Sequence, residues 1–276
     1  MYNICSFYDD VFDEMQELLH YTLQELGFPS QISHHYIYNN MTNIIFGVPV
    51  LGEAGRNVFP KDTIIFNLEQ LDPENYRPAI RQWTDNILTL GKYFTIWDYN
   101  QQNIDLLTQH GVCAKRFDFG YQKNLHRIQA QAQQDIDVLF YGSINYRRQQ
   151  IIDTLKAQGV NVMPVFGVYG KERDQLIARS KLVLNLHQLD TELFEIVRCS
   201  YMMNNGIPIV SEVNPTTNID SHFVQGIAAS PYDQLVETCL DLLQDDFKRQ
   251  KLGYKALEII SQRPQFLLLK DIRLVR

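Results

Sequence analysis

Along most of the chain, short runs of β-branched and aromatic residues alternate with stretches whose apolar residues recur at helical spacing. The first such stretch has apolar residues at positions 15, 18, 19, 23 and 26, and it ends at Gly27 before Pro29. This alternation is typical of α/β layers with a largely parallel sheet. In the first 120 residues the pattern predicts strands at 2–7, 43–48, 63–67, 93–97 and 114–117, with further helices near 77–90 and 100–110.

The same pattern starts again after residues 121–135, a polar, glutamine-rich segment that we interpret as a linker or a surface helix. Beyond it we expect strands at 136–141, 160–165, 182–186 and 207–211, and helices at 146–158, 173–179, 192–204 and 232–243. The chain is therefore predicted to form two doubly wound Rossmann-like domains, residues 1–125 and 126–262, that face each other across a cleft. Residues 263–276 are predicted to be a tail that crosses back to the first domain. Parallel doubly wound sheets bind ligands at the carboxyl ends of their strands.

Composition narrows the classes of protein. With 276 residues, 45% of them apolar and 21% charged, the chain is typical of a globular protein of two ordinary domains. A net charge of -7 disfavours nucleic acid as a partner, because phosphate binding needs clustered lysine and arginine. The four cysteines lie far apart, which predicts reduced thiols and disfavours a zinc site or a disulfide framework.

The N-terminus has no basic segment followed by a long apolar run, so it does not read as a signal peptide. No apolar run approaches the length of a membrane span, and we expect a cytoplasmic protein. The leucine-rich residues 266–269 leave two possibilities open. They either pack against the first domain or form an exposed patch for a partner or for peripheral membrane contact.

The residues after the strand at 136–141 carry the first candidate chemistry. Gly142 would let a ligand approach the backbone closely, and Ser143 and Asn145 lead into a helix. Amides at a helix start, with Arg147 and Arg148 beside them, suit a diphosphate. The alternative is a tight turn with solvated arginines.

Two further strand ends carry candidate residues. Phe166, Gly167 and Tyr169 follow the strand at 160–165, where aromatic rings can stack on a base and glycine amides can bind its edge. The alternative is a turn with aromatic residues in the core. His187 follows the strand at 182–186, although a lone histidine is more often structural.

Glu195 and Arg198 lie three residues apart in the predicted helix at 192–204, so they are neighbours on its surface. A carboxylate near a helix start can accept hydrogen bonds from the hydroxyls of a sugar or a ribose. An arginine one turn later can neutralise phosphate charge. The alternative is an intrahelical ion pair on a solvated face.

Three segments together resemble a known family: DVLFYGSINYRR, FGVYGKERDQLIARSKLVLNLH and FEIVRCSYMMNNGIPIVSE. They are similar to the donor-binding C-terminal domain of GT-B glycosyltransferases, and most of all to short bacterial members grouped with families 1 and 4. The resemblance implies that residues 142–148 lie by the donor diphosphate, residues 166–170 by the nucleotide base and Glu195 by the transferred sugar. Tyr201 departs from the pattern, because commoner members place a ribose-binding glutamate there. Glu192 or Glu212 would then compensate.

The resemblance implies a metal-independent glycosyltransferase of the hexosyltransferase kind. A nucleoside-diphosphate sugar would be its co-substrate, and we expect no other cofactor. The acceptor is not identified and would be a glycan, a lipid, a protein or a small molecule. Negative charge grows on the leaving diphosphate in the transition state, and we expect Arg147, Arg148 and Arg198 to neutralise it. The chain has no DxD motif in a plausible metal-binding loop.

An inverting enzyme also needs a general base, which would come from the first half of the chain. The candidates are Glu69 and Asp98, both at predicted strand ends. Glu53 and the pair His34 and His35 are weaker candidates. A retaining enzyme needs no such base, and the sequence does not decide between the two.

Two other classes of function compete with this hypothesis. The first is a non-catalytic protein that binds a sugar nucleotide or a carbohydrate in the same kind of cleft. The second is a different two-domain α/β enzyme, such as a sugar-nucleotide epimerase or a pyridoxal-phosphate phosphorylase. A dinucleotide-binding dehydrogenase is disfavoured, because no GxGxxG follows the first strand.

Overall fold

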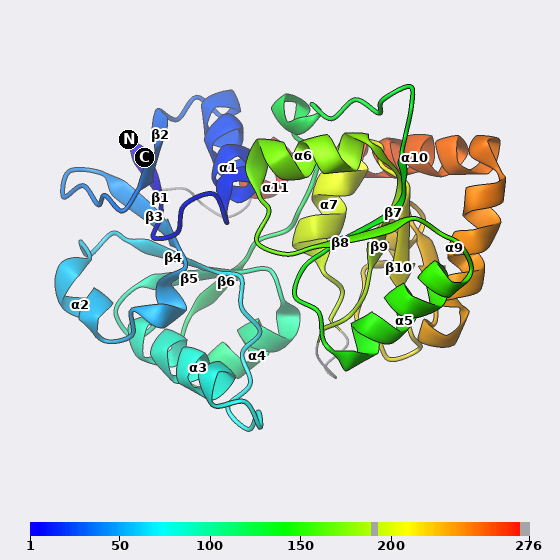
Figure 1. The fold of residues 1–276 in the computed structure, drawn as a ribbon. Helices are drawn as coiled ribbons and strands as arrows, with labels where there is room; N and C mark the ends of the chain where they lie inside the picture. Colours follow the sequence, from blue (N-terminus) through cyan, green and yellow to red (C-terminus); the bar gives the residue numbers. More distant parts are fainter. Residues whose placement is uncertain (189–192, 271–276) are drawn as a thin grey trace. The chain divides into compact units, whose positions relative to one another are not determined.

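The computed structural model describes residues 1–188 and 193–270. The chain divides into two compact units, each with its own parallel sheet (Figure 1). Unit 1 comprises Met1–Phe119 together with α11 (Gln265–Lys270), and unit 2 comprises Gly120–Pro264.

The sheet of unit 1 has the strand order β2-β1-β3-β4-β5-β6, and all of its neighbouring strands run parallel. Strand β2 was not predicted, because its sequence SQISH has one apolar residue and it pairs only along one edge. The six strands are β1 (Tyr2–Ser6), β2 (Ser30–His34), β3 (Thr42–Phe46), β4 (Ile64–Asn67), β5 (Thr95–Asp98) and β6 (Ala114–Arg116).

Helices cover both faces of this sheet (Figure 1). On one face, Ile45 and Ile65 of the sheet form a core cluster with Ile87 of α3 and Leu107 of α4. On the other face lies α1, whose buried leucines form the apolar stripe that the sequence predicted, and α11 packs against α1. The helical segments are α1 (Asp13–Glu25), η1 (Val48–Val50), α2 (Ala54–Val58), α3 (Pro78–Leu90), α4 (Gln101–Gln109) and α11 (Gln265–Lys270).

The sheet of unit 2 has the order β11-β10-β9-β7-β8, again with all neighbouring strands parallel. The observed bounds of β7 match the predicted strand. Every second residue along β7 is fully buried, which is the alternation that identifies a strand in a sequence. The five strands are β7 (Ile136–Tyr141), β8 (Val162–Val165), β9 (Ser180–Asn185), β10 (Ile209–Glu212) and β11 (Ala228–Ser230).

In unit 2, α5 and α9 pack on one face of the sheet and α6, α7 and α10 lie on the other (Figure 1). Helix α10 was not predicted. Its Gly253 lies so close to Gly206 that an added Cβ would come within 2.2 Å of the Gly206 carbonyl oxygen. The helical segments are η2 (Lys123–Leu125), α5 (Tyr146–Ala157), α6 (Gly170–Ala178), α7 (Ile196–Asn204), α8 (Ser221–Val224), η3 (Tyr232–Gln234), α9 (Leu235–Gln244) and α10 (Asp246–Ser261).

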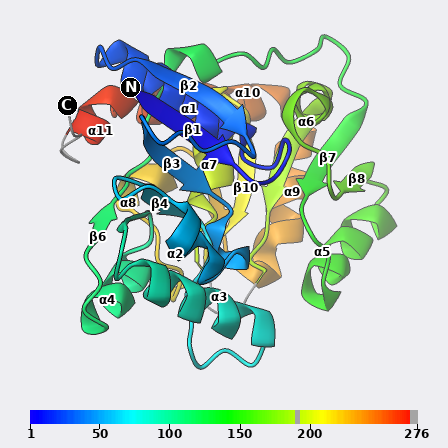
Figure 2. The ribbon, with the colours of Figure 1, turned by 90° about the vertical axis from the view of Figure 1, so that its left-hand side faces the viewer.

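Both sheets share one doubly wound order, in which the first strand lies between the second and the third. Figure 2 shows β1 between β2 and β3 in unit 1. In unit 2, β7 lies in the same way between β8 and β9. The direction of winding reverses between β1 and β3 and between β7 and β9, and such reversals are where open α/β sheets bind ligands.

The segment 121–135 does not form a free linker. The Gln122 amide donates to Oδ1 of Asn204 at 2.9 Å, and Nδ2 of Asn204 donates back to the Gln122 carbonyl. The Arg127 amide donates to Oδ1 of Asn205 at 2.8 Å. These asparagines end α7 and hold the segment in unit 2, so the division between units falls at 119/120 and not at the expected 125/126.

None of the helices in the described part of the chain has both the length and the apolar character needed to cross a bilayer.

Candidate functional site

The loops that follow β7 and β9 are tied together where the winding of unit 2 reverses. Oδ1 of Asn145 caps α5 by accepting a hydrogen bond from the Arg148 amide at 2.9 Å. Nδ2 of Asn145 donates to the Gln188 carbonyl, and Nε2 of Gln188 donates to Oγ of Ser143 at 2.8 Å. These bonds fix the N-terminus of α5, with its partial positive charge, at the carboxyl edge of the sheet.

Arg148 is buried among backbone carbonyls. Its Nε donates to the His187 carbonyl at 3.2 Å, and its Nη1 donates to the Ser143 carbonyl at 2.8 Å. The remaining nitrogen, Nη2, donates to the Leu186 carbonyl and lies 3.4 Å from Oε1 of Glu195. Burial lowers the pKa of Arg148 to about 10, so the side chain stays charged at neutral pH. The geometry does not support the predicted diphosphate contact, because all three guanidinium nitrogens are used to join the two loops.

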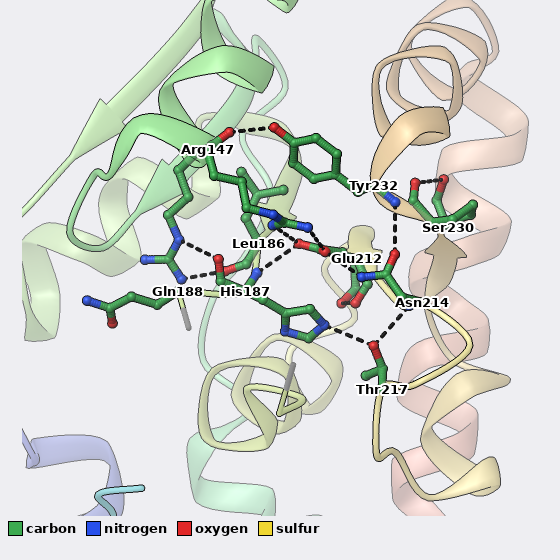
Figure 3. A network of polar contacts seen from close by, with 12 residues as sticks. Arg147, Leu186, His187, Gln188, Glu212, Asn214, Thr217, Ser230 and Tyr232 are labelled. Carbon is green, nitrogen blue, oxygen red and sulfur yellow. Dashed lines mark hydrogen bonds and ion pairs between the residues drawn. The ribbon is translucent and has the colours of Figure 1, made fainter. Parts of the chain in front are cut away.

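Arg147 pairs with Glu212 at the end of β10 (Figure 3). Two guanidinium nitrogens donate to the two carboxylate oxygens, one of them at 2.6 Å, and the guanidinium lies 3.8 Å from the ring centre of Tyr232. Glu212 also accepts from the His187 amide at 3.0 Å and from Asn214 at 2.7 Å. Burial would raise the pKa of Glu212, but the hydrogen bond from Arg147 and the other donors hold it below its ordinary value.

Glu212 is therefore fully buried and bonded within the protein, which does not fit its expected role in holding a ribose. The other residue expected in that role, Glu192, lies outside the described residues.

His187 is buried beside this pair. Its Nε2 lies 3.1 Å from Oγ1 of Thr217 (Figure 3), and its Nδ1 makes a charge contact of 3.3 Å with Oε2 of Glu195 that is not an aligned hydrogen bond. Burial would lower the pKa of His187, but Glu195 raises it above its ordinary value. Glu195 itself keeps 22% of its side chain exposed and accepts a hydrogen bond from Asn185 at 3.0 Å.

Among the three arginines expected at the diphosphate, Arg198 makes the fewest hydrogen bonds within the described residues. Its Nη1 donates to Oδ1 of Asn185 at 2.9 Å, and its guanidinium lies 4.7 Å from the ring centre of Tyr141. Its Nε is buried without a hydrogen-bond partner among residues 1–188 and 193–270. Gly142 has a φ of +143°, and a Cβ there would lie 3.1 Å from Nη2 of Arg198. The positive φ favours glycine at this position, and an added Cβ would also press on the guanidinium at the end of β7.

The loop after β8 presents aromatic side chains to solvent. Phe166 is 70% exposed and Tyr169 is also exposed, so they are not the core aromatics of the alternative interpretation. Gly167 has a φ of +73°, which turns the chain before α6. Strand β8 pairs in parallel with β7. The loop after β8 is therefore a neighbour of the loop after β7, which leads to Arg147 and Arg148.

Tyr201 stands where the resemblance to GT-B glycosyltransferases predicts a ribose-binding glutamate, and its hydroxyl is held by hydrogen bonds within unit 2. The side chain is buried, and its hydroxyl donates to Oδ2 of Asp174 at 2.8 Å. Nε of Arg127 donates to the same hydroxyl at 3.0 Å. Burial raises the pKa of Tyr201, so the phenol stays neutral, and its hydrogen bond to Asp174 links α7 to α6.

In unit 1, Asp98 is fully buried at the end of β5. Its carboxylate accepts hydrogen bonds from Nδ2 of Asn67 at 2.7 Å, from Nδ2 of Asn103 at 3.0 Å and from the Asn100 amide at 2.8 Å. Burial raises its pKa to about 7. The prediction that Asp98 is a general base is not supported, because the carboxylate has no surface that an acceptor can touch.

The other base candidates are more accessible. Glu69 is half-buried, and burial raises its pKa. Glu53 is exposed just before α2, and Nε2 of His34 lies 4.0 Å from Asp13. Nε2 of His35 lies 3.0 Å from Oδ1 of Asp9, and both side chains are largely exposed. Within the described residues, no group of three or more His, Cys, Asp or Glu side chains is placed to hold a metal ion, so metal independence stays a prediction.

Asn185 was not among the predicted site residues, although it contacts both Glu195 and Arg198. Its Nδ2 donates to Glu195 and to Oγ of Ser211, and its Oδ1 accepts from Arg198. The available signal was one amide side chain in the otherwise apolar end of the strand KLVLNLH. Glu195 and Arg198 therefore meet at Asn185 and do not form the intrahelical ion pair of the alternative interpretation, since Glu195 precedes α7.

Comparisons by sequence give relatives but no family. No protein-family profile matches the chain. An uncharacterized protein of Acanthamoeba polyphaga mimivirus is 31% identical over 205 residues, which are 72% of this chain and 62% of that protein. A second uncharacterized protein of the same virus is 26% identical over 223 residues, 78% of this chain and 29% of that protein. The chain thus spans less than two thirds of either relative, and these viral relatives lend no support to the expected bacterial origin.

Comparisons by structure cover nearly the whole chain. Anabaena HepE in complex with UDP-glucose has a TM-score of 0.62 at 12% identity, covering 99% of this chain and 98% of that one. T4 phage BGT in complex with its UDP-glucose substrate has a TM-score of 0.60 at 10% identity, covering 99% of both chains. WaaG, a glycosyltransferase involved in lipopolysaccharide biosynthesis, has a TM-score of 0.58 at 11% identity, covering 98% of both. These likenesses confirm the predicted fold: the chain has the GT-B architecture of two Rossmann-like domains.

Proposed function

We propose that this protein is a glycosyltransferase that takes a sugar from a nucleoside-diphosphate sugar bound at the carboxyl edge of the unit 2 sheet. The observation that carries the proposal is Arg198, which stands beside Gly142 with donor capacity left over, at the point where the winding reverses between β7 and β9. Two proteins of the same fold, HepE and T4 phage BGT, were crystallised with UDP-glucose.

In this proposal the diphosphate lies between Arg198 and the N-terminus of α5. Both supply positive charge, and the helix start adds backbone N–H groups. Arg147 is partly exposed and adds a second cation, which Glu212 holds in place. The base stacks on the exposed aromatic loop after β8, which contains Phe166 and Tyr169.

Glu195 is the residue proposed to face the transferred sugar. Its carboxylate keeps a free, partly exposed surface, while Asn185 and Arg148 fix its orientation. A carboxylate held in this way accepts hydrogen bonds from sugar hydroxyls without reorganising when the ligand binds.

The chemical step in this proposal needs charge stabilisation at two places. The sugar ring gains positive charge in the transition state while the leaving diphosphate gains negative charge. The fixed cations Arg198 and Arg147 and the start of α5 stabilise the diphosphate, and we propose that they act without a metal ion. The acceptor binds unit 1, whose Glu69 is the accessible carboxylate at a strand end.

The experiment that tests the proposal is release of nucleoside diphosphate from a panel of UDP-, GDP-, ADP- and dTDP-sugars. Water can take the place of the acceptor in a slow hydrolysis of the donor, so turnover can be measured before the acceptor is known. We expect release from one nucleotide class, with and without EDTA, and strong loss in Glu195→Gln. A protein that binds a donor but releases nothing from any member would instead be the non-catalytic binder.

A further inference from the structure

The carboxyl edge of the unit 1 sheet is a second place that suits a ligand, because the direction of winding reverses there between β1 and β3. Tyr8 follows β1, and its ring lies over Gly47, which follows β3; a Cβ on Gly47 would come within 2.7 Å of that ring. Oγ of Ser6 accepts from the Tyr8 amide at 3.0 Å and donates to the Tyr8 carbonyl at 2.8 Å. The backbone of Tyr8 is therefore fixed, while its ring is partly exposed at the point of reversal.

The loop after β2 presents a second tyrosine at the same edge. The carbonyl of Tyr36 accepts hydrogen bonds from Nδ2 of Asn3 and Oγ of Ser33, both at 3.0 Å, so its backbone is held. Its ring is nevertheless 69% exposed. Because β2 pairs with β1 in parallel register, the loops after these two strands are neighbours.

A polar pair joins the two loops. Nε2 of His35 lies 3.0 Å from Oδ1 of Asp9, and both side chains are largely exposed. Each retains unused capacity, since Asp9 has a second carboxylate oxygen and His35 a second ring nitrogen. The edge thus combines two exposed rings with groups that accept and donate hydrogen bonds.

The part of the chain that supplies β1, β2, β3 and the loops after them carries a net negative charge. The first 55 residues contain seven Asp and Glu and neither lysine nor arginine, and the first basic residue is Arg56. Asp13 and Glu14 already occupy the first turn of α1, where a helix N-terminus would otherwise attract an anion. A phosphate or sulfate group would therefore meet repulsion here, whereas a neutral molecule would not.

We propose that this edge binds a neutral carbohydrate. A sugar ring has an apolar C–H face that packs on an aromatic ring, which suits Tyr8 and Tyr36. Its hydroxyls both donate and accept hydrogen bonds, which suits Asp9 and His35. The further statement that this carbohydrate is the acceptor rests on the proposed glycosyltransferase function.

The test is saturation-transfer difference NMR on the full chain without nucleotide. The probes are maltohexaose, cellohexaose and chitohexaose, with a heparin-derived hexasaccharide as the anionic comparison. We expect transfer to at least one neutral probe and none to the sulfated one. Tyr36→Ala should weaken binding at least fivefold, and Asp9→Asn should weaken it about threefold. Tyr254→Ala is the matched control, because Tyr254 is 74% exposed on α10 of unit 2.

Absence of binding by all three neutral probes would overturn the inference, as would tighter binding of the sulfated hexasaccharide. Wild-type binding by Tyr36→Ala would also overturn it, since that ring is exposed and its removal leaves the fold intact. The measurement separates this inference from the proposed function. Donor turnover without carbohydrate binding would refute the unit 1 site alone, and carbohydrate binding without donor turnover would refute the transferase alone.

Discussion

Replacement of Arg198 tests the donor site most directly. Arg198→Ala removes a guanidinium of which Nη1 is bound to Asn185, while Nη2, which carries two N–H groups, lies beside Gly142 at the end of β7. Two charge-assisted hydrogen bonds to a diphosphate are worth about 1.5 kcal/mol each at the low end of their range. A loss of about 3 kcal/mol corresponds to about 100-fold weaker binding. Arg198→Lys keeps the charge but not the planar fork, so we expect it to bind about tenfold more weakly than wild type.

The assay is isothermal titration of each protein with the nucleoside diphosphate that the wild type binds best. Arg179→Ala is the control, because Arg179 pairs with Asp135 at the opposite, amino-terminal edge of the same sheet. Arg198→Ala also leaves Oδ1 of Asn185 without its donor, so its thermal midpoint must be measured and the titration run well below it. If Arg198→Ala binds within threefold of wild type, the diphosphate does not lie at Arg198 and the reasoning fails.

Gly142→Ala adds a Cβ at a φ of +143° and 3.1 Å from Nη2 of Arg198, so nucleotide binding in the same titration should weaken about tenfold; unchanged affinity would contradict the close approach. Glu212→Gln removes the buried charge that pairs with Arg147, so the free energy of unfolding in urea should fall by about 3 kcal/mol, and an unchanged midpoint would argue against the pair. Burial raises the pKa of Asp98 from 3.8 to about 7, so the folded state keeps a proton that the unfolded chain releases. The free energy of unfolding should therefore fall by about 4 kcal/mol as the pH rises from about 4 to 8, and Asp98→Asn should abolish that fall. Equal pH dependence of denaturant unfolding in both proteins would show that Asp98 is not its source.

Much of the fold could be predicted because buried parallel strands are apolar along their length. The sequence of β7 identifies that strand without further information. The missed elements depend on tertiary contacts. Strand β2 is held by pairing with β1 although its sequence is polar, and α10 contains Gly253 because its backbone meets Gly206. Neither contact is visible to a local pattern.

The position of the candidate site could be predicted from the sequence, but the hydrogen-bond partners of its side chains could not. The sequence puts Arg147, Arg148 and Arg198 near one sheet edge, and the structure places them there. Which of them has donors left over depends on partners far away in the chain. Arg148 is occupied by carbonyls some forty residues later, at the end of β9, and Arg147 by Glu212 at the end of β10. Asp98 was correctly placed at a strand end, but the asparagines that enclose it come from other elements.

The first and last residues of unit 2 pair with each other, which has a consequence for how the chain connects the two units. Tyr121 and Pro264 form a parallel bridge, and the Tyr121 amide donates to the Arg263 carbonyl at 2.8 Å. The two ends of unit 2 therefore leave side by side, as they do in a domain inserted into a host domain. A fragment of residues 120–264 is continuous and retains its closing pair. A fragment that stops at residue 119 lacks α11, which packs on α1 and binds the Asp118 carbonyl through Gln265. In chain order, unit 2 is therefore a continuous domain inserted between the two segments that form unit 1.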